Sequence, residues 1–285
     1  MLEALAVGLI PGSAYALIAV SILLTYRMLG VLDFSQTTVG AFGTYAGLAL
    51  LGAGVPDFLA AALGVICGMA LSTIVGLIMV RWFAGARIEI KSSVTIAIML
   101  ALIAIAFRVF GNEQRSLTNI FPRISFVVFG VHFTLATIAG LLFALLIGAA
   151  LAAVLRLTRV GILLRALSER PTTAELLGVP VNALAIAVWA AAGGIATIAI
   201  TLVAPNRTAN FVALSALLLP GMAGALLGLF RSVPRTIAGG ILIGLLEGGS
   251  SYFNAIAPYR DALSFVVILL ALLWSQRRDT WDEAR

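Results

Sequence analysis

The chain has 285 residues, of which 62% are hydrophobic and only 11% are charged, with a formal net charge of +6. Soluble domains carry about 25% charged residues, so the composition excludes a soluble globular protein and predicts an all-α, polytopic membrane protein. The single cysteine, Cys67, excludes a disulfide framework and a cysteine metal cluster. The basic excess needs no nucleic acid, because loops beside an anionic membrane leaflet carry such a charge.

We expect a single transmembrane domain over residues 1–285, since no stretch resembles a separate soluble domain. The start, Met1-Leu2-Glu3, lacks the basic region of a cleavable signal, which predicts that the first apolar segment is kept as a span. Apolar segments then follow one another along the chain as candidate spans. They cover residues 5–26, 35–51, 58–80, 93–110, 132–155, 182–204, 212–230, 236–254 and 262–275.

The weakest candidates are 35–51, 212–230 and 262–275. We predict eight or nine transmembrane helices, depending on whether 35–51 and 212–230 cross fully or re-enter the membrane. Pro11 and Pro220 are candidate breaks, because a proline frees a backbone carbonyl that protein or water must then satisfy.

Glycines recur at helical spacing in three of the segments, and this spacing lets helix backbones approach closely in lipid. A Gly-rich segment followed by a second apolar span occurs at 40–80 and again at 221–254, which predicts two loosely related halves, as in many transporters. The glycines are Gly40, Gly43 and Gly47; Gly221, Gly224 and Gly228; and Gly240, Gly244 and Gly248.

The segment 156–180 is charged and lies between two apolar runs that are long enough to cross a bilayer. We expect a locally ordered loop that contacts another molecule in the cytosol. The alternative is a helix that rests on the bilayer surface. The charged residues of the segment are Arg156, Arg159, Arg165, Glu169, Arg170 and Glu175.

Within this loop, Thr172 and Glu175 have the Thr-x-x-Glu spacing of a capping box. The spacing predicts a short helix over 173–177. Gly178 can then take a left-handed turn, and Pro180 forbids continuation of the helix. Two apolar side chains are expected on one face of this helix, those of Ala174 and Leu177.

Basic residues are unevenly divided between the two sides that alternating loops would occupy. If all nine segments cross, thirteen lie on one side and five on the other, a positive-inside bias. The bias predicts a cytosolic 156–180 loop and C-terminus, and an N-terminus outside. The thirteen are Arg27, Arg81, Arg87, Lys91, Arg156, Arg159, Arg165, Arg170, Arg231, Arg235, Arg277, Arg278 and Arg285; the five are Arg108, Arg115, Arg123, Arg207 and Arg260.

Few ionisable groups lie inside the predicted spans. Glu247 is near the middle of 236–254, where an acidic residue costs about 2.5–3.5 kcal/mol. It therefore either lines a pore or is buried as a partner for a helix end or for Ser250 and Ser251. Asp33, beside Gln36 and Thr37, is interpreted as a cap of the second span.

We expect the cargo to meet polar groups at the predicted break after the first span, because discontinuous helices form the substrate sites of many transporters. The apolar, Gly-rich spans hold almost no fixed charge, which favours a small cargo with an apolar part. The candidate pathway residues are Asp33, Phe34, Ser35, Gln36, Thr37 and Glu247.

The sequence contains no catalytic constellation, so we do not expect an enzyme. It has no Gly-rich phosphate loop that ends in Lys-Ser or Lys-Thr, and its one histidine and one cysteine lie in separate segments. We expect the chain to bind no cofactor and no metal.

Five motifs follow one another along the chain. They are Gly12-Ser13-Ala14-Tyr15-Ala16-Leu17; Leu29-Gly30-Val31-Leu32-Asp33-Phe34; Arg165-Ala166 through Ala174-Glu175-Leu176-Leu177-Gly178-Val179; Gly239-Gly240-Ile241-Leu242 with Leu246-Glu247; and Tyr259-Arg260-Asp261-Ala262. In this order they resemble the permease subunits of branched-chain amino-acid ABC importers, over essentially the whole chain. The resemblance implies a pore-forming subunit of a bacterial inner membrane. It also implies a homologous permease, two cytosolic ATPases that use ATP, and an extracytoplasmic substrate-binding protein as partners.

By the same resemblance, the loop 156–180 is the coupling loop that docks in a groove on an ATPase. The chain departs from the family at Ser35-Gln36-Thr37, where many relatives have Ala-His-Gly, and this departure bears on the substrate. The order Ala174-Glu175 also differs from the Glu-Ala-Ala order of importer coupling loops. The implied coupling residues are Arg165, Glu169, Arg170, Thr172, Glu175, Leu177 and Gly178.

Two other classes of protein are the alternatives to an importer of branched-chain or other small amino acids. An ion-coupled secondary transporter of a small organic solute would need an intramembrane coupling site, for which Glu247 and Asp33 are the available carboxylates. A purely structural subunit is the third class, and an ordered cytosolic loop argues against it.

Overall fold

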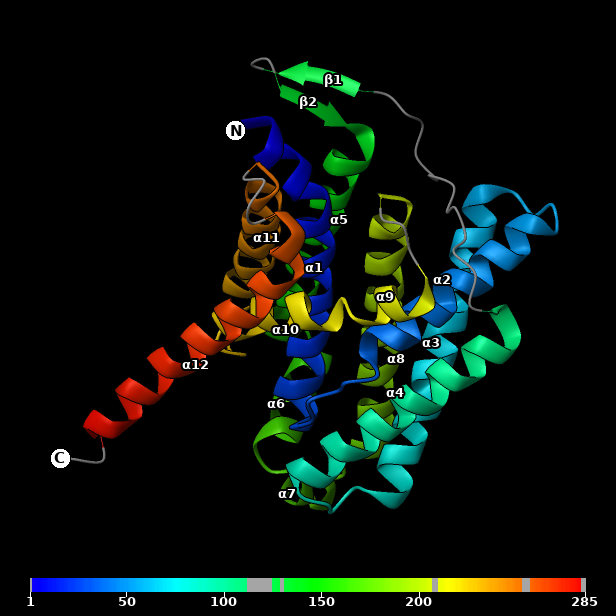
Figure 1. The fold of residues 1–285 in the computed structure, drawn as a ribbon. Helices are drawn as coiled ribbons and strands as arrows, with labels where there is room; N and C mark the ends of the chain where they lie inside the picture. The colour runs from blue at the N-terminus through cyan, green and yellow to red at the C-terminus, as the bar shows by residue number, and fades with distance from the viewer. Residues whose placement is uncertain (1, 112–124, 129–130, 207–209, 253–256, 283–285) are drawn as a thin grey trace.

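The computed structural model describes residues 2–111, 125–128, 131–206, 210–252 and 257–282. Over these residues the chain is helical apart from one hairpin, in which β1 (Ser125–Val128) pairs antiparallel with β2 (Val131–Thr134) (Figure 1). The helices are α1 (Leu2–Leu29), α2 (Gln36–Gly52), α3 (Asp57–Trp82), α4 (Ile88–Phe110), α5 (Leu135–Leu157), α6 (Arg159–Glu169), α7 (Pro171–Leu176), α8 (Val181–Val203), α9 (Phe211–Ser215), α10 (Leu218–Leu227), α11 (Val233–Ser250) and α12 (Leu263–Asp282), with short 3₁₀ turns at Ala204–Asn206 and Ala257–Ala262.

Every apolar segment predicted from the sequence has a helical counterpart, but not every one is a complete span. Five helices, α1, α3, α4, α5 and α8, are long and apolar enough to cross a membrane. The second segment forms α2 with 17 residues, about 25 Å at 1.5 Å per residue, whereas a bilayer core is about 30 Å thick. The chain is therefore a helical, multi-pass membrane protein. The total of eight or nine crossings and the relationship between two halves remain predictions.

The structure moves one of the two predicted breaks and contradicts the other. The segment 212–230 is split into α9 and α10 between Ser215 and Leu218. Pro220 lies just after this break, in the first turn of α10, where the missing N–H removes no helical bond. The expected break at Pro11 is wrong, because α1 is continuous from Leu2 to Leu29 and is supported by α11, α10 and α8.

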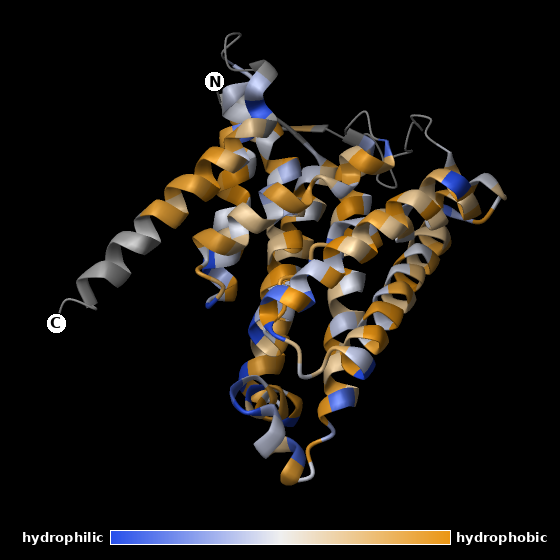
Figure 2. Ribbon diagram, turned by 60° about the horizontal axis from the view of Figure 1, so that its bottom comes forward, coloured by the Kyte–Doolittle hydropathy of each residue, from blue (hydrophilic) through white to orange (hydrophobic). Residues whose placement is uncertain are grey.

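Helix α1 is the centre of the bundle, and α11 packs antiparallel against it. The contact is so close that a Cβ on Gly244 would lie 2.2 Å from the Cα of Gly12, and one on Gly240 would lie 2.4 Å from the Cα of Ala16. Only residues without a bulky side chain allow this approach, which confirms that the glycine spacing serves helix packing. Figure 2 shows that hydrophobic residues make up most of the long helices.

Several of the connections between helices lie at two opposite ends of the molecule (Figure 1). At the first, here called the basic end, Nη1 of Arg27 donates a hydrogen bond to the carbonyl of Arg231 at 3.1 Å, which joins the end of α1 to the turn before α11. The α3–α4 turn and α6–α7 lie at the same end, because Gly85, Lys91 and Thr172 line one cavity there. The opposite end, here called the hairpin end, holds the N-terminus and the hairpin.

Candidate functional site

The charged loop at the basic end contains more structure than the sequence predicted. It folds into α6 and α7, and α6 begins where Oγ1 of Thr158 accepts a hydrogen bond from the N–H of Gly161 at 3.1 Å. Leu164 and Leu167 are buried against the bundle, whereas Arg165 points outward. This spacing of apolar and charged residues is the sequence signal that could have located α6.

The predicted capping box does not form. Helix α7 begins at Pro171 rather than after Thr172, its N-cap position is Arg170, and it has no side-chain cap. A proline is well suited to the first position of a helix because its φ is already helical. Thr172 therefore lies inside the first turn, where its hydroxyl cannot cap the helix start.

The predicted end of the helix is confirmed. Gly178 has φ +82°, the left-handed conformation that glycine adopts most easily. Its N–H donates to the carbonyl of Glu175 at 2.9 Å, and the N–H of Val179 donates to the carbonyl of Ala174 at 3.0 Å. These two bonds satisfy carbonyls at the helix end, and α8 starts directly after Pro180.

The predicted coupling residues lie together on the outside of the basic end. Ala174 is buried, but Leu177 is 80% exposed and its neighbour Leu176 is 88% exposed, so Ala174 and Leu177 do not share a face. Exposed leucines beside charged groups, outside the apolar body of the protein, form a surface that can pack against another protein. The predicted residues, all exposed, are Arg165, Glu169, Arg170, Thr172, Glu175, Leu177 and Gly178.

The segment between α1 and α2 is non-helical and enters the bundle from the basic end. The N–H of Phe34 donates to Oγ1 of Thr95 at 3.2 Å, and the single proton of this hydroxyl is shared between the carbonyls of Leu32 at 3.2 Å and Ser92 at 2.8 Å. Thr95 lies seven residues beyond the start of α4 at Ile88, about 10 Å along the helix. Irregular backbone at membrane depth is tolerated only where protein or water satisfies it, and Thr95 does this here.

Asp33 does not cap α2 directly. Its Oδ1 accepts hydrogen bonds from the N–H of Ser35 at 2.9 Å and from Oγ of Ser35 at 2.6 Å. Ser35 is the residue before α2 and has no side-chain cap of its own. The Asp33 carboxylate therefore stabilises a turn that precedes the helix, an Asx-type arrangement.

Gln36 and Thr37 lie at the start of α2, where α2 meets the break between α9 and α10. Oγ1 of Thr37 donates to the carbonyl of Ser215, the last residue of α9, at 2.7 Å. Gln36 is completely buried, and neither polar atom of its amide has a hydrogen-bond partner in the described part of the chain. The structure thus brings two irregular segments together and leaves a buried amide at their junction.

Glu247 is buried on α11 and faces α1. The hydroxyl of Tyr15 donates a hydrogen bond to its Oε2. The expected pairing with Ser250 and Ser251 is wrong, because those hydroxyls donate to backbone carbonyls of α11, that of Ser250 to Glu247 itself. A hydroxyl 232 positions away along the chain has no signature in the local sequence, so Tyr15 was not foreseen as the partner.

Two cavities meet at Glu247. The α10 cavity, about 350 Å³, is lined by Glu247, Tyr15, Ser264 and by apolar residues that include Leu217, Pro220 and Phe265. The Arg260 cavity, about 220 Å³, lies toward the hairpin end and is lined by Glu247, Pro11, Ser251 and Arg260 among others. Glu247 is a wall residue of both.

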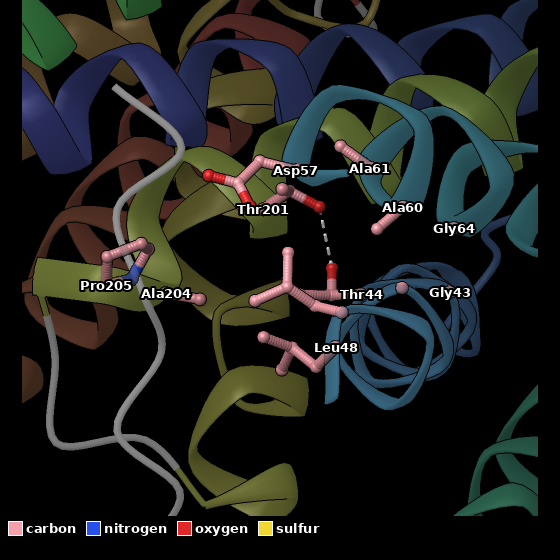
Figure 3. Close-up of a pocket in the computed structure, with 12 residues that line it drawn as sticks. Gly43, Thr44, Leu48, Asp57, Ala60, Ala61, Gly64, Thr201, Ala204 and Pro205 are labelled. Atoms are coloured by element: carbon pink, nitrogen blue, oxygen red, sulfur yellow. Dashed lines mark hydrogen bonds between the residues drawn. The ribbon is translucent and has the colours of Figure 1, made fainter. Parts of the chain in front are cut away.

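A further pocket lies between α2, α3 and α8 (Figure 3). The hydroxyls of Thr44 and Thr201 share a hydrogen bond of 3.0 Å across it, and Asp57 lies at its edge. Its volume is about 40 Å³, whereas pockets that bind small organic molecules measure about 300–1,000 Å³. It is too small for an amino acid. No group of three potential metal-ligating side chains occurs among the described residues.

Comparison with known proteins gives a consistent result. The family described as "Branched-chain amino acid transport system / permease component" matches residues 4–272. The chain is 26% identical to the probable branched-chain amino acid transport permease protein LivH of Methanocaldococcus jannaschii, over 93% of this chain and 88% of that protein. It is 24% identical to the high-affinity branched-chain amino acid permease LivH of Escherichia coli K12, over 93% and 91%, and 25% identical to BraD of Pseudomonas aeruginosa, over 96% and 93%.

Among solved structures, PsaBC from Streptococcus pneumoniae in complex with Fab aligns over 94% of this chain and 89% of that chain, with a TM-score of 0.44 and 16% identity. This likeness is too weak to support an argument about the fold or the function.

Proposed function

Because the chain belongs to the permease family of branched-chain amino acid transport systems, we propose that it is the membrane-spanning subunit of an ATP-driven importer of branched-chain or other small amino acids. It is not an enzyme, since the family consists of transport permeases. In the proposed assembly it forms the pathway with a second permease. Two cytosolic ATPases bind and use ATP, and an extracytoplasmic binding protein delivers the cargo.

The single observation that carries the proposal is the family match over residues 4–272. The names of relatives from an archaeon and from two bacteria support the cargo class, because each is described as a branched-chain amino acid permease. The bundle of apolar helices supports a multi-pass inner-membrane location.

In this proposal, α6 and α7 dock on an ATPase from the basic end. Leu176 and Leu177 supply apolar contact area, and the surrounding charges, among them Arg165 and Glu175, give the contact its orientation. The basic end then faces the cytosol, in agreement with the positive-inside rule, and the N-terminus and the hairpin lie outside.

The proposed coupling route runs from α6–α7 to the α1–α2 connection. The two are adjacent, since Gly30, Thr172 and Glu175 line the same cavity at the basic end. Gly30 has φ +62°, so the chain turns sharply there before it enters the bundle toward Asp33. Movement of α7 during ATPase closure would shift this turn, and with it the junction of α2 and α9 at Gln36.

Reconstitution tests the proposed function. The chain, its permease partner and the two ATPases are placed in proteoliposomes, with the binding protein outside and ATP at the ATPase side. We expect uptake of radiolabelled leucine that requires both ATP and the binding protein. Uptake by this chain alone, driven by an imposed proton or sodium gradient, would instead identify an ion-coupled secondary transporter.

A further inference from the structure

A cavity of about 380 Å³ at the basic end, here called the basic-end cavity, lies between α7 and the body of the bundle. Its walls come from the end of α1 and the connection after it, the α3–α4 turn, the start of α4, α6, α7 and α8 (Figure 1). The volume is within the range of about 300–1,000 Å³ found for pockets that bind small molecules. In the proposed orientation this cavity opens to the cytosol, away from the side where cargo is delivered.

The basic-end cavity has an apolar floor and a polar rim. Met28, Met79 and Trp189 line the floor, and each is at most 4% exposed. Thr172 and Asn182 line the rim and are exposed. A few polar groups around an apolar surface are typical of sites that bind a small molecule and fix its orientation.

Two opposite charges line this cavity and are not used elsewhere in the described structure. Lys91 comes from α4 and Glu175 from α7, and the other lining residues are uncharged. Neither side chain forms an ion pair or a hydrogen bond with another described residue, and they do not pair with each other. The three donors of the ammonium and the lone pairs of the carboxylate are therefore available to a ligand.

We propose that the basic-end cavity is a regulatory site for a zwitterionic amino acid with an apolar side chain, taken from the cytosol. The ammonium of Lys91 donates hydrogen bonds to the ligand's carboxylate, and the carboxylate of Glu175 accepts them from its ammonium group. The apolar side chain of the ligand lies on the floor beside Trp189. The regulatory role rests on the proposed import function, since the imported product would then act on its own import.

The charges of the cavity select against other ligands. A nucleotide or another phosphate ester carries more negative charge than Lys91 can balance, and Glu175 would repel it. A divalent metal ion would find one carboxylate, whereas calcium takes six to eight oxygen ligands. A zwitterion matches one acidic and one basic group, and bonds between ionised partners are about twice as strong as neutral ones.

A ligand bound in this way would link two parts that move apart in the proposed coupling route. It would join Glu175 on α7 to Lys91 on α4, beside the sharp turn at Gly30. A ligand stabilises the state to which it binds best, so it would oppose the movement of α7. We therefore expect the amino acid at the basic end to slow ATP-driven uptake.

Binding is tested by protection of a cysteine on the floor. Ala185 lines the cavity and is 6% exposed, so Ala185→Cys is made in a Cys67→Ala chain and assembled with its partners in phosphatidylcholine nanodiscs, which leave both faces open. Methyl methanethiolsulfonate, a small uncharged reagent, then modifies the thiol. We expect L-leucine to slow the reaction. Two analogues, 4-methylpentanoate without the ammonium group and isopentylamine without the carboxylate, should need concentrations at least about tenfold higher.

The control position is Ala183, which is exposed on α8 and does not line the cavity. The thiol of Ala183→Cys should react at the same rate with and without leucine.

Charge variants assign the two ends of the ligand. Lys91→Gln and Glu175→Gln should each raise the leucine concentration needed for protection about tenfold. Lys91→Gln should not weaken protection by isopentylamine, which has no carboxylate, and Glu175→Gln should not weaken protection by 4-methylpentanoate. Arg87→Gln and Glu169→Gln are matched controls, because both residues are exposed charges at the same end that do not line the cavity.

Three results would overturn the site. The first is a thiol of Ala185→Cys that the reagent does not reach without ligand, since the cavity would then be closed. The second is leucine protection that stays within twofold of the parent in both charge variants. The third is a reaction rate that ignores leucine but falls when phosphatidylethanolamine replaces phosphatidylcholine, which would assign the cavity to a lipid headgroup.

Regulation is measured in proteoliposomes of the complete complex, with unlabelled leucine enclosed at the ATPase side. We expect the initial rate of ATP-driven uptake to fall by about half or more at saturating enclosed leucine. Relative to its own uninhibited rate, Lys91→Gln should need about tenfold more leucine for the same effect. Protection of Ala185→Cys without slower uptake would overturn the regulatory role. Absence of ATP-driven uptake in the parent complex would instead refute the import function, while the labelling still decides the site.

Discussion

The amide of Gln36 is an unusual group to find in a tightly packed membrane protein. It is fully buried, and the described residues offer no hydrogen-bond partner to its oxygen or its nitrogen. An amide buried in this way costs about 1–3 kcal/mol by mutational measurements. We infer that Gln36 gains partners in another state of the transport cycle, when the junction of α2 with the α9–α10 break opens to water or cargo.

Replacement of Gln36 by Met, which has a similar length and no amide, should therefore stabilise the described state. We expect the free energy of unfolding to rise by about 1–3 kcal/mol, seen as a higher Tm of the purified protein in detergent, while the transport rate falls. Thr44→Val is the control, because Oγ1 of Thr44 is bonded to Gly40 and Thr201; it should lower Tm. A lower Tm for Gln36→Met would contradict the inference.

The contact between α1 and α11 should tolerate no added methyl group at Gly244. A Cβ there would lie 2.2 Å from the Cα of Gly12, whereas one at Gly249 on the same helix would lie 3.4 Å from a flexible end of Leu5. We expect Gly244→Ala to destabilise the protein by about 1–3 kcal/mol or more through overpacking, and Gly249→Ala to be close to neutral. Thermal unfolding of both variants measures the difference; equal Tm values would show that the helices can separate without cost.

The sequence was informative about which residues are unusual but not about what they contact. Glu247 stood out as a charge within a span, and Asp33 to Thr37 as a polar stretch after the first span. Their partners Tyr15, Thr95 and Ser215 are 232, 61 and 178 positions away along the chain. Pairings of this kind depend on the tertiary packing of helices, for which no local pattern exists.

At the scale of elements, hydrophobic runs predicted the positions of the long helices well. The structure inside the polar loops was predicted poorly. Each apolar run formed a helix, or two short helices in the case of 212–230, because a buried or lipid-facing backbone must satisfy its hydrogen bonds internally. In the 156–180 loop two residues could have set the start of α7. The helix begins at Pro171, and the hydroxyl of Thr172 does not cap it. The amphipathic helix α6 was not predicted, although the spacing of the buried residues Leu164 and Leu167 is typical of a helix with one apolar face.

Two threonines in this loop give a matched comparison. Thr158 caps α6 through its hydroxyl, whereas Thr172 lies inside α7 and caps nothing. We expect Thr158→Ala to lower the stability of α6 by about 0.5–2 kcal/mol, and Thr172→Ala to change it by less than about 0.5 kcal/mol. Amide hydrogen exchange over α6 and α7 in the assembled complex measures both effects. Faster exchange in Thr172→Ala than in Thr158→Ala would mean that the capping box forms in the membrane after all.

At the scale of the whole molecule, the distribution of charge predicted which loops lie together. Arg27 and Arg231 are in contact at the basic end, and Lys91 lines the cavity beside α7, as expected for residues assigned to one side. Arg115, Arg123 and Arg207 of the opposite group lie outside the described residues. Which end faces the cytosol depends on membrane insertion and therefore requires an experiment.

Cysteine labelling decides the orientation. In a Cys67→Ala chain, Arg81→Cys and Arg165→Cys should react with a membrane-impermeant thiol reagent only after the cells are opened, and Asp57→Cys should react in intact cells. All three positions are exposed in the isolated chain, so the labelling is carried out on the chain expressed without the ATPases. Reaction of Arg165→Cys in intact cells would show that the orientation is the opposite one. Helix α7 would then lie outside the cell, where no ATP is available to a partner ATPase.

The pairing of the first long helix with α11 also has a consequence for biosynthesis. About 200 residues separate the end of α1 from the start of α11, so at a synthesis rate of roughly 5–20 residues per second α1 waits some 10–40 s for its partner. During that interval its polar side chains must be satisfied within the helix. The hydroxyls of Ser13, Ser21 and Thr25 meet this need, because each donates to a carbonyl three residues earlier in α1. The hydroxyl of Tyr15 differs, since its partner Glu247 is on α11. Helix α1 is thus able to remain in lipid before the helix that packs against it has been made.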